Sequence, residues 1–201
     1  MLLAIDTSTH YASVAIHDRS RLLAEYSWLT NQDHTRTLLP AVRRLLVDSG
    51  TTLADVSVVA VALGPGSFNG LRVGLSTAKA LALARAVPLV GVPTLELLAA
   101  EYGLEVVTMN AGRGQMYRWQ GPSPDIDIVE GVPPDRVRHA GVLAELGWLR
   151  LQAGRALPPA QAQPVYVRPP QITESRVKTH MLEPWAGAEP SAPAGAAASP
   201  C

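Results

Sequence analysis

The segment GPGSFNGLRVG at residues 64–74 constrains the fold more than any other part of the chain, because it places four glycines and a proline within eleven residues. The apolar, β-branched run at 56–63 before it is typical of a buried strand, and the small and apolar residues after it predict a helix to about residue 86. Ser67 or Asn69 can cap that helix. Glycine at such a strand-to-helix junction permits positive φ and lets another backbone, or an anion, approach the first helical turn.

The glycine spacing does not match the common phosphate-binding loops. A Walker A loop that starts at Gly64 meets Asn69 where its second glycine should stand, and the third glycine of a dinucleotide fingerprint comes one residue late, at Gly70. A nucleophile elbow needs glycine where Pro65 stands. A glycine-rich turn that opens a tightly packed helix therefore remains an alternative to a ligand site.

Composition bounds the class of protein. The chain has 201 residues and is 47% apolar, which suffices for one domain or two small lobes with a real core. The 17 Lys and Arg residues balance 17 Asp and Glu, without the basic run of a strong nucleic-acid binder. The single cysteine, Cys201, excludes an internal disulfide and a thiolate metal cluster. With no signal-like or membrane-length segment visible, we expect a cytoplasmic protein.

The pattern of apolar residues predicts an α/β fold. We expect strands at residues 2–7, 12–17, 21–28, 56–63 and 89–92, and helices at 33–48, 68–86 and 94–102. Asn31 or Asp33 can cap the first helix, and Pro40 should lie near its start or bend it. Three hairpin-linked strands followed by alternating helices and strands predict a mixed sheet covered by helices.

A second, smaller lobe follows. We expect strands at residues 105–110, 115–120 and 125–129 and a helix at 135–152, after which prolines interrupt everything except the short run Val165–Val167. The sequence therefore divides into an N-terminal lobe at 1–103, a reduced C-terminal lobe at 104–175 and an Ala/Pro-rich tail at 176–201. The tail has too few large apolar residues to offset the entropy of ordering, so we expect it to be disordered.

Several segments together carry a family resemblance. AIDTST, DHTRTLLPAV, GPGSFNGLRVGLSTAKALA, GVPTLELLA and PVYVR resemble the TsaB (YeaZ) family, closely over residues 1–101 and loosely over 106–168. The resemblance implies the two-lobed actin-like/Hsp70-like/sugar-kinase (ribonuclease H-like) fold. It also implies a non-catalytic, activating subunit of the bacterial complex that makes threonylcarbamoyladenosine in tRNA. The sequence departs from the family in the second lobe, with Asn110-Ala111-Gly112 and Gln115 where an Asp-Ala-Arg start and a later Glu are usual.

The same resemblance implies the partners. They are a TsaD-like catalytic subunit and a TsaE-like ATPase, with tRNA contacted only indirectly through the complex and no membrane involved. Without the catalytic subunit we expect a homodimer, because an exposed apolar patch favours self-association.

An enzyme of this fold would need acidic groups that the chain only partly has. An active kinase places an Asp at the end of the first strand, a glycine-bearing hairpin after it and a second Asp in the second lobe. Asp6 is present, but the turn at 7–9 lacks glycine and Asn110 cannot be ionised. Asp6 is then a capping or hairpin-stabilising carboxylate. We expect a non-catalytic chain, with a stand-alone small-molecule kinase or ATPase of the same fold as the alternative.

The histidines do not suggest a metal site, because none of the five forms a pair at the i, i+4 spacing that binds zinc on a helix. We therefore expect no metal and no tightly bound cofactor. Binding of ATP or ADP at the boundary with a partner subunit remains an alternative. The residues that would approach it are Asp6, Gly64, Gly66, Ser67 and Arg72, through charge and the N–H groups of the helix start.

The helix at 68–86 provides the evidence for a binding role. Gly70, Gly74, Ala78 and Ala82 recur every four residues, and larger apolar residues surround much of the circumference, so the helix must be covered on several faces. The resemblance implies that this helix and the one at 33–48 pack against matching helices of the catalytic subunit. The candidate contacts, to be divided between core and interface, are Leu38, Leu39, Val42, Gly74, Leu75, Ala78 and Ala82.

Overall fold

The computed structural model describes residues 1–30 and 33–168. The described residues belong to one compact unit. The tail at 176–201, with Cys201, and the candidate cap Asn31 lie outside the described residues. No helix in the described ranges is both long enough and apolar enough to cross a membrane.

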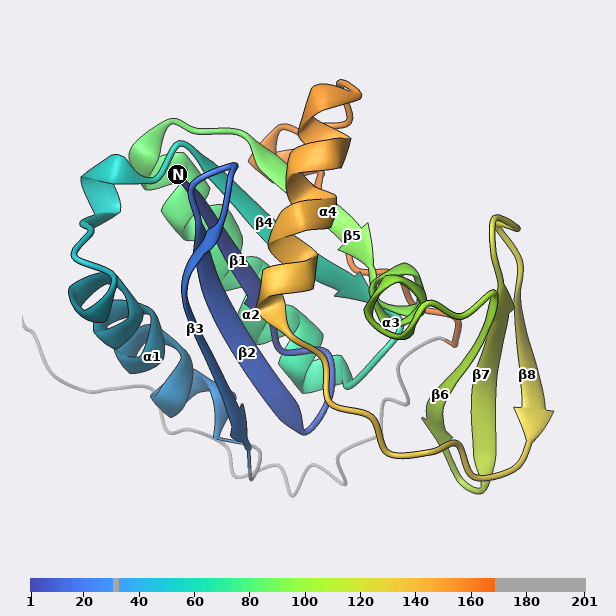
Figure 1. Cartoon of the computed structure of the whole chain (residues 1–201). Helices are drawn as coiled ribbons and strands as arrows, with labels where there is room; N and C mark the ends of the chain where they lie inside the picture. Colours follow the sequence, from blue (N-terminus) through green and yellow to red (C-terminus); the bar gives the residue numbers. More distant parts are fainter. Residues whose placement is uncertain (31–32, 169–201) are drawn as a thin grey trace, which may run out of the picture. The chain divides into compact units, whose positions relative to one another are not determined.

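A five-stranded mixed sheet forms the centre of the fold (Figure 1). Its strands are β1 (Leu2–Asp6), β2 (Tyr11–His17), β3 (Leu22–Leu29), β4 (Val58–Gly64) and β5 (Leu89–Pro93), in the spatial order β3-β2-β1-β4-β5. β1, β2 and β3 pair antiparallel, whereas β4 and β5 continue the sheet in parallel with β1. β1 is buried along its whole length, because both faces of the central sheet are covered. The structure confirms the predicted mixed sheet.

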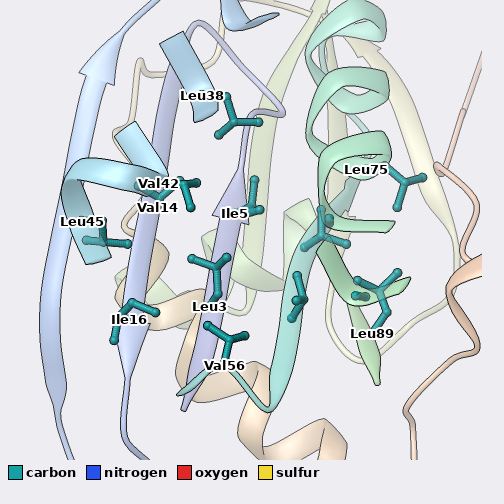
Figure 2. Packing of buried hydrophobic residues seen from close by; sticks show 14 of the residues in the cluster. Leu3, Ile5, Val14, Ile16, Leu38, Val42, Leu45, Val56, Leu75 and Leu89 are labelled. Carbon is teal, nitrogen blue, oxygen red and sulfur yellow. The ribbon is translucent and has the colours of Figure 1, made fainter. Parts of the chain in front are cut away.

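Two helices cover one face of this sheet, and a third returns from late in the chain to cover the other. α1 (His34–Asp48) and α2 (Phe68–Arg85) pack on the first face, where Leu38, Val42 and Leu75 belong to one buried cluster with strand residues such as Leu3 and Ile5 (Figure 2). α4 (Ala140–Gln152) packs on the second face, where its buried side chains meet apolar residues of β1, β2, β4 and β5. The sheet thus has a core on each side.

A second, three-stranded sheet follows α3 along the chain, and its strand β6 lines part of the crevice described below. α3 (Thr94–Tyr102) precedes the antiparallel strands β6 (Val106–Gly112), β7 (Gln115–Gln120) and β8 (Ile126–Glu130). The shared cluster consists of Leu95, Leu98, Val107, Met109 and Tyr117. The predicted strands of the second lobe are therefore present. Two short 3-10 helices, Leu53–Asp55 and Pro159–Gln161, complete the regular structure.

The segment before α4 differs from the sequence prediction. The predicted helix at 135–152 begins only at Ala140, and residues 132–139 form an irregular connection. Long-range contacts hold this segment outside the helix, because Arg138 pairs with Asp6 and the N–H of His139, the extended N-cap of α4, donates to Glu101. The division at residue 104 assigned this helix to the second lobe, whereas its packing is with the first sheet. Val165–Val167 form no strand, although the Val165 N–H donates to the Leu63 carbonyl at 2.7 Å.

Candidate functional site

The glycines of the junction face the turn between β1 and β2. A Cβ atom at Gly66 would lie 2.2 Å from the Ser8 carbonyl oxygen, and one at Gly70 would lie 2.0 Å from the Thr7 carbonyl oxygen. At Gly74 it would lie 2.1 Å from the Thr7 hydroxyl. Positions four residues apart share one helix face, so these glycines remove side chains where α2 crosses the turn. The close neighbour that the glycines admit is the chain's own turn, through its backbone at Gly66 and Gly70 and through the Thr7 side chain at Gly74.

Hydrogen bonds join the start of α2 to the turn between β1 and β2 at the same place. The Ser67 N–H donates to the Ser8 carbonyl at 2.7 Å, and the Thr7 hydroxyl donates to the Gly70 carbonyl at 2.7 Å. Ser67, one of the two caps that the sequence allowed, is the N-cap of α2, and its hydroxyl accepts from the Gly70 N–H at 3.3 Å. The Ser67 N–H, expected from sequence to be available to a nucleotide, is therefore bonded within the chain.

A buried ion pair lies directly behind this turn. The Arg138 Nε lies 3.0 Å from Asp6 Oδ2, and the two side chains are only 3% and 1% exposed. The other carboxylate oxygen of Asp6 accepts from the N–H and the hydroxyl of Ser8, at 2.8 and 2.5 Å. Arg138 Nη2 donates in turn to the hydroxyls of Ser8, at 3.1 Å, and Thr9, at 2.8 Å. Asp6 is thus the hairpin-stabilising carboxylate that the sequence indicated, with its charge compensated by a guanidinium.

The segment that carries Arg138 is anchored on both sides of that residue. On one side, Asp135 lies 3.4 Å from the ring of His10. On the other, the ring of His139 lies 2.6 Å from Glu101, and the His139 N–H donates to the same carboxylate at 3.3 Å. The hydrogen bond to Glu101 raises the pKa of His139 above its usual value. The connection before α4 therefore joins the first hairpin to α3.

Two small hollows flank the turn. One, of about 270 Å³, is lined by Ser8, Gly66, Ser67 and Asn110 among others, and the second, of about 300 Å³, reaches Arg136 and Arg138. Both touch Thr9, His10 and Asn110, so they form one crevice between the first hairpin and β6. Each is at or below the lower limit of typical small-molecule pockets. Within residues 1–30 and 33–168, no group of three or more His, Cys, Asp or Glu side chains could hold a metal ion.

The five residues expected near a nucleotide do not form one site. Gly66 and Ser67 line the crevice, whereas Asp6 is buried against Arg138. The Gly64 N–H donates to the Thr94 hydroxyl at 3.0 Å, and Arg72 lies over the Phe68 ring at 5.1 Å. Sequence reasoning missed Arg138, because it lies 132 residues from Asp6 and inside a predicted helix. The buried Asp6 at a strand end was the available signal, since such a charge needs a partner.

The structure also separates core from surface among the candidate partner contacts. Leu38, Val42, Leu75, Ala78 and Ala82 are buried against the chain's own sheet, and Gly74 faces Thr7. These positions follow the 3.6-residue period that turns one side of each helix toward the strands. Leu39 is 54% exposed and is the one member of the predicted set whose side chain reaches the surface of this helix pair.

The exposed side of the helix pair combines apolar and basic groups. We define the outer face as Leu39, Arg43 and Val47 of α1 with Arg72, Ser76 and Leu83 of α2. Val47 is 67% and Leu83 is 64% exposed. A hollow of about 340 Å³ between the helices includes Leu39, Arg72 and Ser76, and a shallow one of about 520 Å³ over α1 includes Leu39, Arg43 and Val47. Exposed apolar side chains gathered in this way are typical of protein interaction surfaces.

The family profile and two curated relatives that match this chain are named for the same tRNA modification. The profile of the family described as TsaD, tRNA N6-adenosine threonylcarbamoyltransferase, matches residues 28–131. The tRNA threonylcarbamoyladenosine biosynthesis protein TsaB of Escherichia coli is 42% identical over 98 residues, covering 49% of this chain and 42% of that protein. TsaB of Bacillus subtilis is 38% identical over 120 residues, covering 58% and 52%. The chain thus spans about half the length of these curated relatives.

Longer matches come from an uncharacterised protein and from solved structures. A Mycobacterium tuberculosis protein of unassigned function is 31% identical, covering 89% of this chain and 96% of its own length. YeaZ from Pseudomonas aeruginosa superposes with a TM-score of 0.66 at 27% identity, covering 83% of this chain and 99% of that chain. A second Pseudomonas aeruginosa structure, described as similar to peptidase YeaZ, gives a TM-score of 0.71 at 26% identity with the same coverage.

Proposed function

Because this chain belongs to the TsaB (YeaZ) family and itself matches the TsaD threonylcarbamoyltransferase profile, we propose that it is a non-catalytic subunit in tRNA threonylcarbamoyladenosine biosynthesis. In this role it binds a TsaD-like catalytic subunit through the outer face of α1 and α2 and holds that subunit in an active conformation. A TsaE-like ATPase joins the complex, and tRNA is held through the complex as a whole.

The Asp6–Arg138 pair is the observation that carries the non-catalytic assignment. A carboxylate that ligates Mg²⁺ must be accessible to the ion, but the Asp6 side chain is 1% exposed and its charge is already compensated by Arg138. Asn110, which lines the neighbouring crevice, has no ionisable group to act as a general base. Of the two carboxylates that metal-dependent phosphoryl transfer would need here, one is buried against a guanidinium and the other is replaced by an amide. These features favour a binding role over a stand-alone kinase.

The proposal is tested by co-purification with the TsaD-like subunit of the same organism. Wild-type chain should be retained, and Leu39→Asp should reduce retention strongly, since it places a charge at the centre of the outer face. Val132→Asp is the matched control, because Val132 is also highly exposed but lies on the connection before α4. A variant at Ala78 would be unsuitable, because that side chain is fully buried in the core.

Two results would contradict the proposal. One is the absence of any complex between the wild-type chain and the TsaD-like subunit, with both proteins folded by circular dichroism. The other is Mg²⁺-dependent ATP turnover by the purified chain that disappears in an Asp6→Ala variant of unchanged fold. Restoration of threonylcarbamoyladenosine in a TsaB-depleted bacterium provides the cellular readout.

A further inference from the structure

Gly64 is the one glycine of the junction that does not face the turn between β1 and β2. It ends β4 with a φ of +107°, and a Cβ atom there would lie 2.7 Å from the Val165 carbonyl oxygen and 2.9 Å from Leu71 Cδ1. The Leu71 side chain can turn aside, whereas a backbone oxygen moves only with its chain. Glycine at this position therefore admits both the positive φ and the backbone of a segment from much later in the sequence.

We define the clasp as Val165–Arg168, the last four residues that the structure describes. Its first half binds the end of β4 and the start of α2. The Val165 N–H donates to the Leu63 carbonyl at 2.7 Å, and the centre of the Tyr166 ring lies 5.3 Å from that of the Phe68 ring. Shortly before the clasp, Ala162 is fully buried in the core of the first sheet. The clasp therefore starts from a fixed point on the first sheet.

The second half of the clasp binds the second sheet. Val167 packs against the cluster that β6 and β7 share with α3, and Arg168 Nη2 donates to Gln115 Oε1. Gln115 begins β7, two residues before Tyr117 of that cluster, so the two side chains lie on the same face of the sheet. Four consecutive residues thus connect the two sheets.

Few contacts hold the clasp in place. Val165 is 37% and Tyr166 is 39% exposed, and among the described residues one backbone hydrogen bond joins the clasp to β4. Segments with few buried contacts open at a lower free energy than the core on which they lie. The clasp can therefore detach while both sheets remain folded.

We propose that the clasp sets the position of the second sheet relative to the first, and with it the width of the crevice. The crevice lies between the first hairpin and β6, where the connection that carries Arg138 already joins the hairpin to α3. The clasp adds a second tie, from Leu63 to Gln115. While it is attached, the two sheets move as one body. When it detaches, the second sheet pivots on α3 and on the Arg138 connection.

The inference deepens the proposed function by describing how a non-catalytic chain keeps one shape. A stand-alone kinase would close its two lobes on the substrate in each turnover. An attached clasp instead holds the sheets at one separation. The tests below need no partner, so the clasp inference can fail while the complex with the TsaD-like subunit still forms.

The first experiment measures the separation of the two sheets in the full chain by pulsed electron spin resonance. Spin labels are attached at Ser20→Cys, in the turn before β3, and at Asp127→Cys on β8, both exposed, with Cys201→Ser to remove the native thiol. We expect one narrow distance distribution in this labelled parent. Tyr166→Ala, which removes the ring contact with Phe68, should broaden it at least about twofold.

Gly64→Ala in the labelled parent should broaden the distribution as well, because its Cβ would displace the Val165 carbonyl. Gly50→Ala is the matched control: Gly50 also has a positive φ, of +66°, but nothing lies within 4 Å of an added Cβ. It should leave the width unchanged. The inference is overturned if Tyr166→Ala and Gly64→Ala keep the parent's width, or if the parent is already as broad as these variants.

The second experiment uses hydrogen exchange of the unlabelled full chain, which decides the question even if Gly64→Ala does not fold. Tyr166→Ala should speed exchange in β6 and β7 by about tenfold and leave β1 and β4 within about twofold of wild type. Tyr166→Phe keeps the ring and should exchange like wild type. Equal acceleration in both sheets, or none in either, would overturn the inference.

Discussion

Replacement of Arg138 by methionine should destabilise the whole protein, because it leaves the Asp6 carboxylate buried without its counter-charge. Methionine keeps much of the apolar stem and removes the guanidinium, so the change is mainly electrostatic. Both partners are almost completely buried, which means that solvent screens their interaction little. The substitution also deletes the hydrogen bonds that Arg138 donates to Ser8 and Thr9.

Breaking one partner of such a buried pair typically costs about 3–5 kcal/mol in the free energy of unfolding. For a domain of this length, 1 kcal/mol corresponds to roughly 2–4 °C in the midpoint of thermal unfolding. We therefore expect Arg138→Met to lower the midpoint by roughly 6–20 °C, measured by circular dichroism or calorimetry at neutral pH.

Two controls separate the ion pair from the general effect of losing an arginine. Arg136→Met changes a residue on the same connection that lies over the Tyr102 ring at 4.5 Å, and it should cost no more than about 1 kcal/mol. The double variant Asp6→Asn, Arg138→Met removes the orphaned charge and should recover part of the lost stability. A midpoint for Arg138→Met equal to that of Arg136→Met would refute the reasoning, as would a double variant that is less stable than Arg138→Met.

Two further expectations concern the glycine crossing and the anchor at His139. Gly70→Ala should lower the unfolding midpoint although alanine favours helices, since its Cβ would lie 2.0 Å from the Thr7 carbonyl oxygen, and unchanged stability in thermal denaturation would contradict this contact. Because Glu101 raises the pKa of His139 in the folded state, the stabilisation is present below the unfolded pKa of about 6.5 and is lost as pH rises through the folded pKa. His139→Gln should therefore reduce stability more near pH 5.5 than near pH 9, which urea unfolding at the two pH values measures, and an equal loss at both would disprove the linkage.

The regular elements could be predicted from the sequence because local patterns determine them. Apolar runs of strand length and the glycine junction locate β1, β4 and the start of α2, and α3 was predicted with its observed bounds. In α1 and α2 the helical period identifies a buried side, but it does not say what covers that side. For this reason Leu38 and Leu39 were equivalent candidates from sequence, although one is in the core and the other is on the surface.

The polar site could be predicted only in part. Asp6 stood out by its place at the end of an apolar strand, and its hydrogen bond to the Ser8 N–H follows from local turn chemistry. Its pairing with Arg138 spans 132 positions, and no local period encodes such a contact. The apolar pattern also pointed away from this contact, because it predicts that Arg138 lies in the first turn of a helix at 135–152, whereas α4 begins at Ala140. The contact forms because α4 packs on the first sheet, which brings the residue just before it next to the end of β1.

The packing of α4 on the first sheet determines when this sheet can complete its core during translation. Leu2, Ala4, Ala60 and Val90 belong to the first half of the chain, but their cover comes from residues after 139. While ribosomes are still translating the second half, a nascent chain with β1, β4 and β5 in place therefore presents a bare apolar sheet surface. Such a surface is a target for chaperones and for aggregation until residue 152 has left the exit tunnel. Early termination of translation would thus produce an aggregation-prone fragment rather than a smaller functional protein.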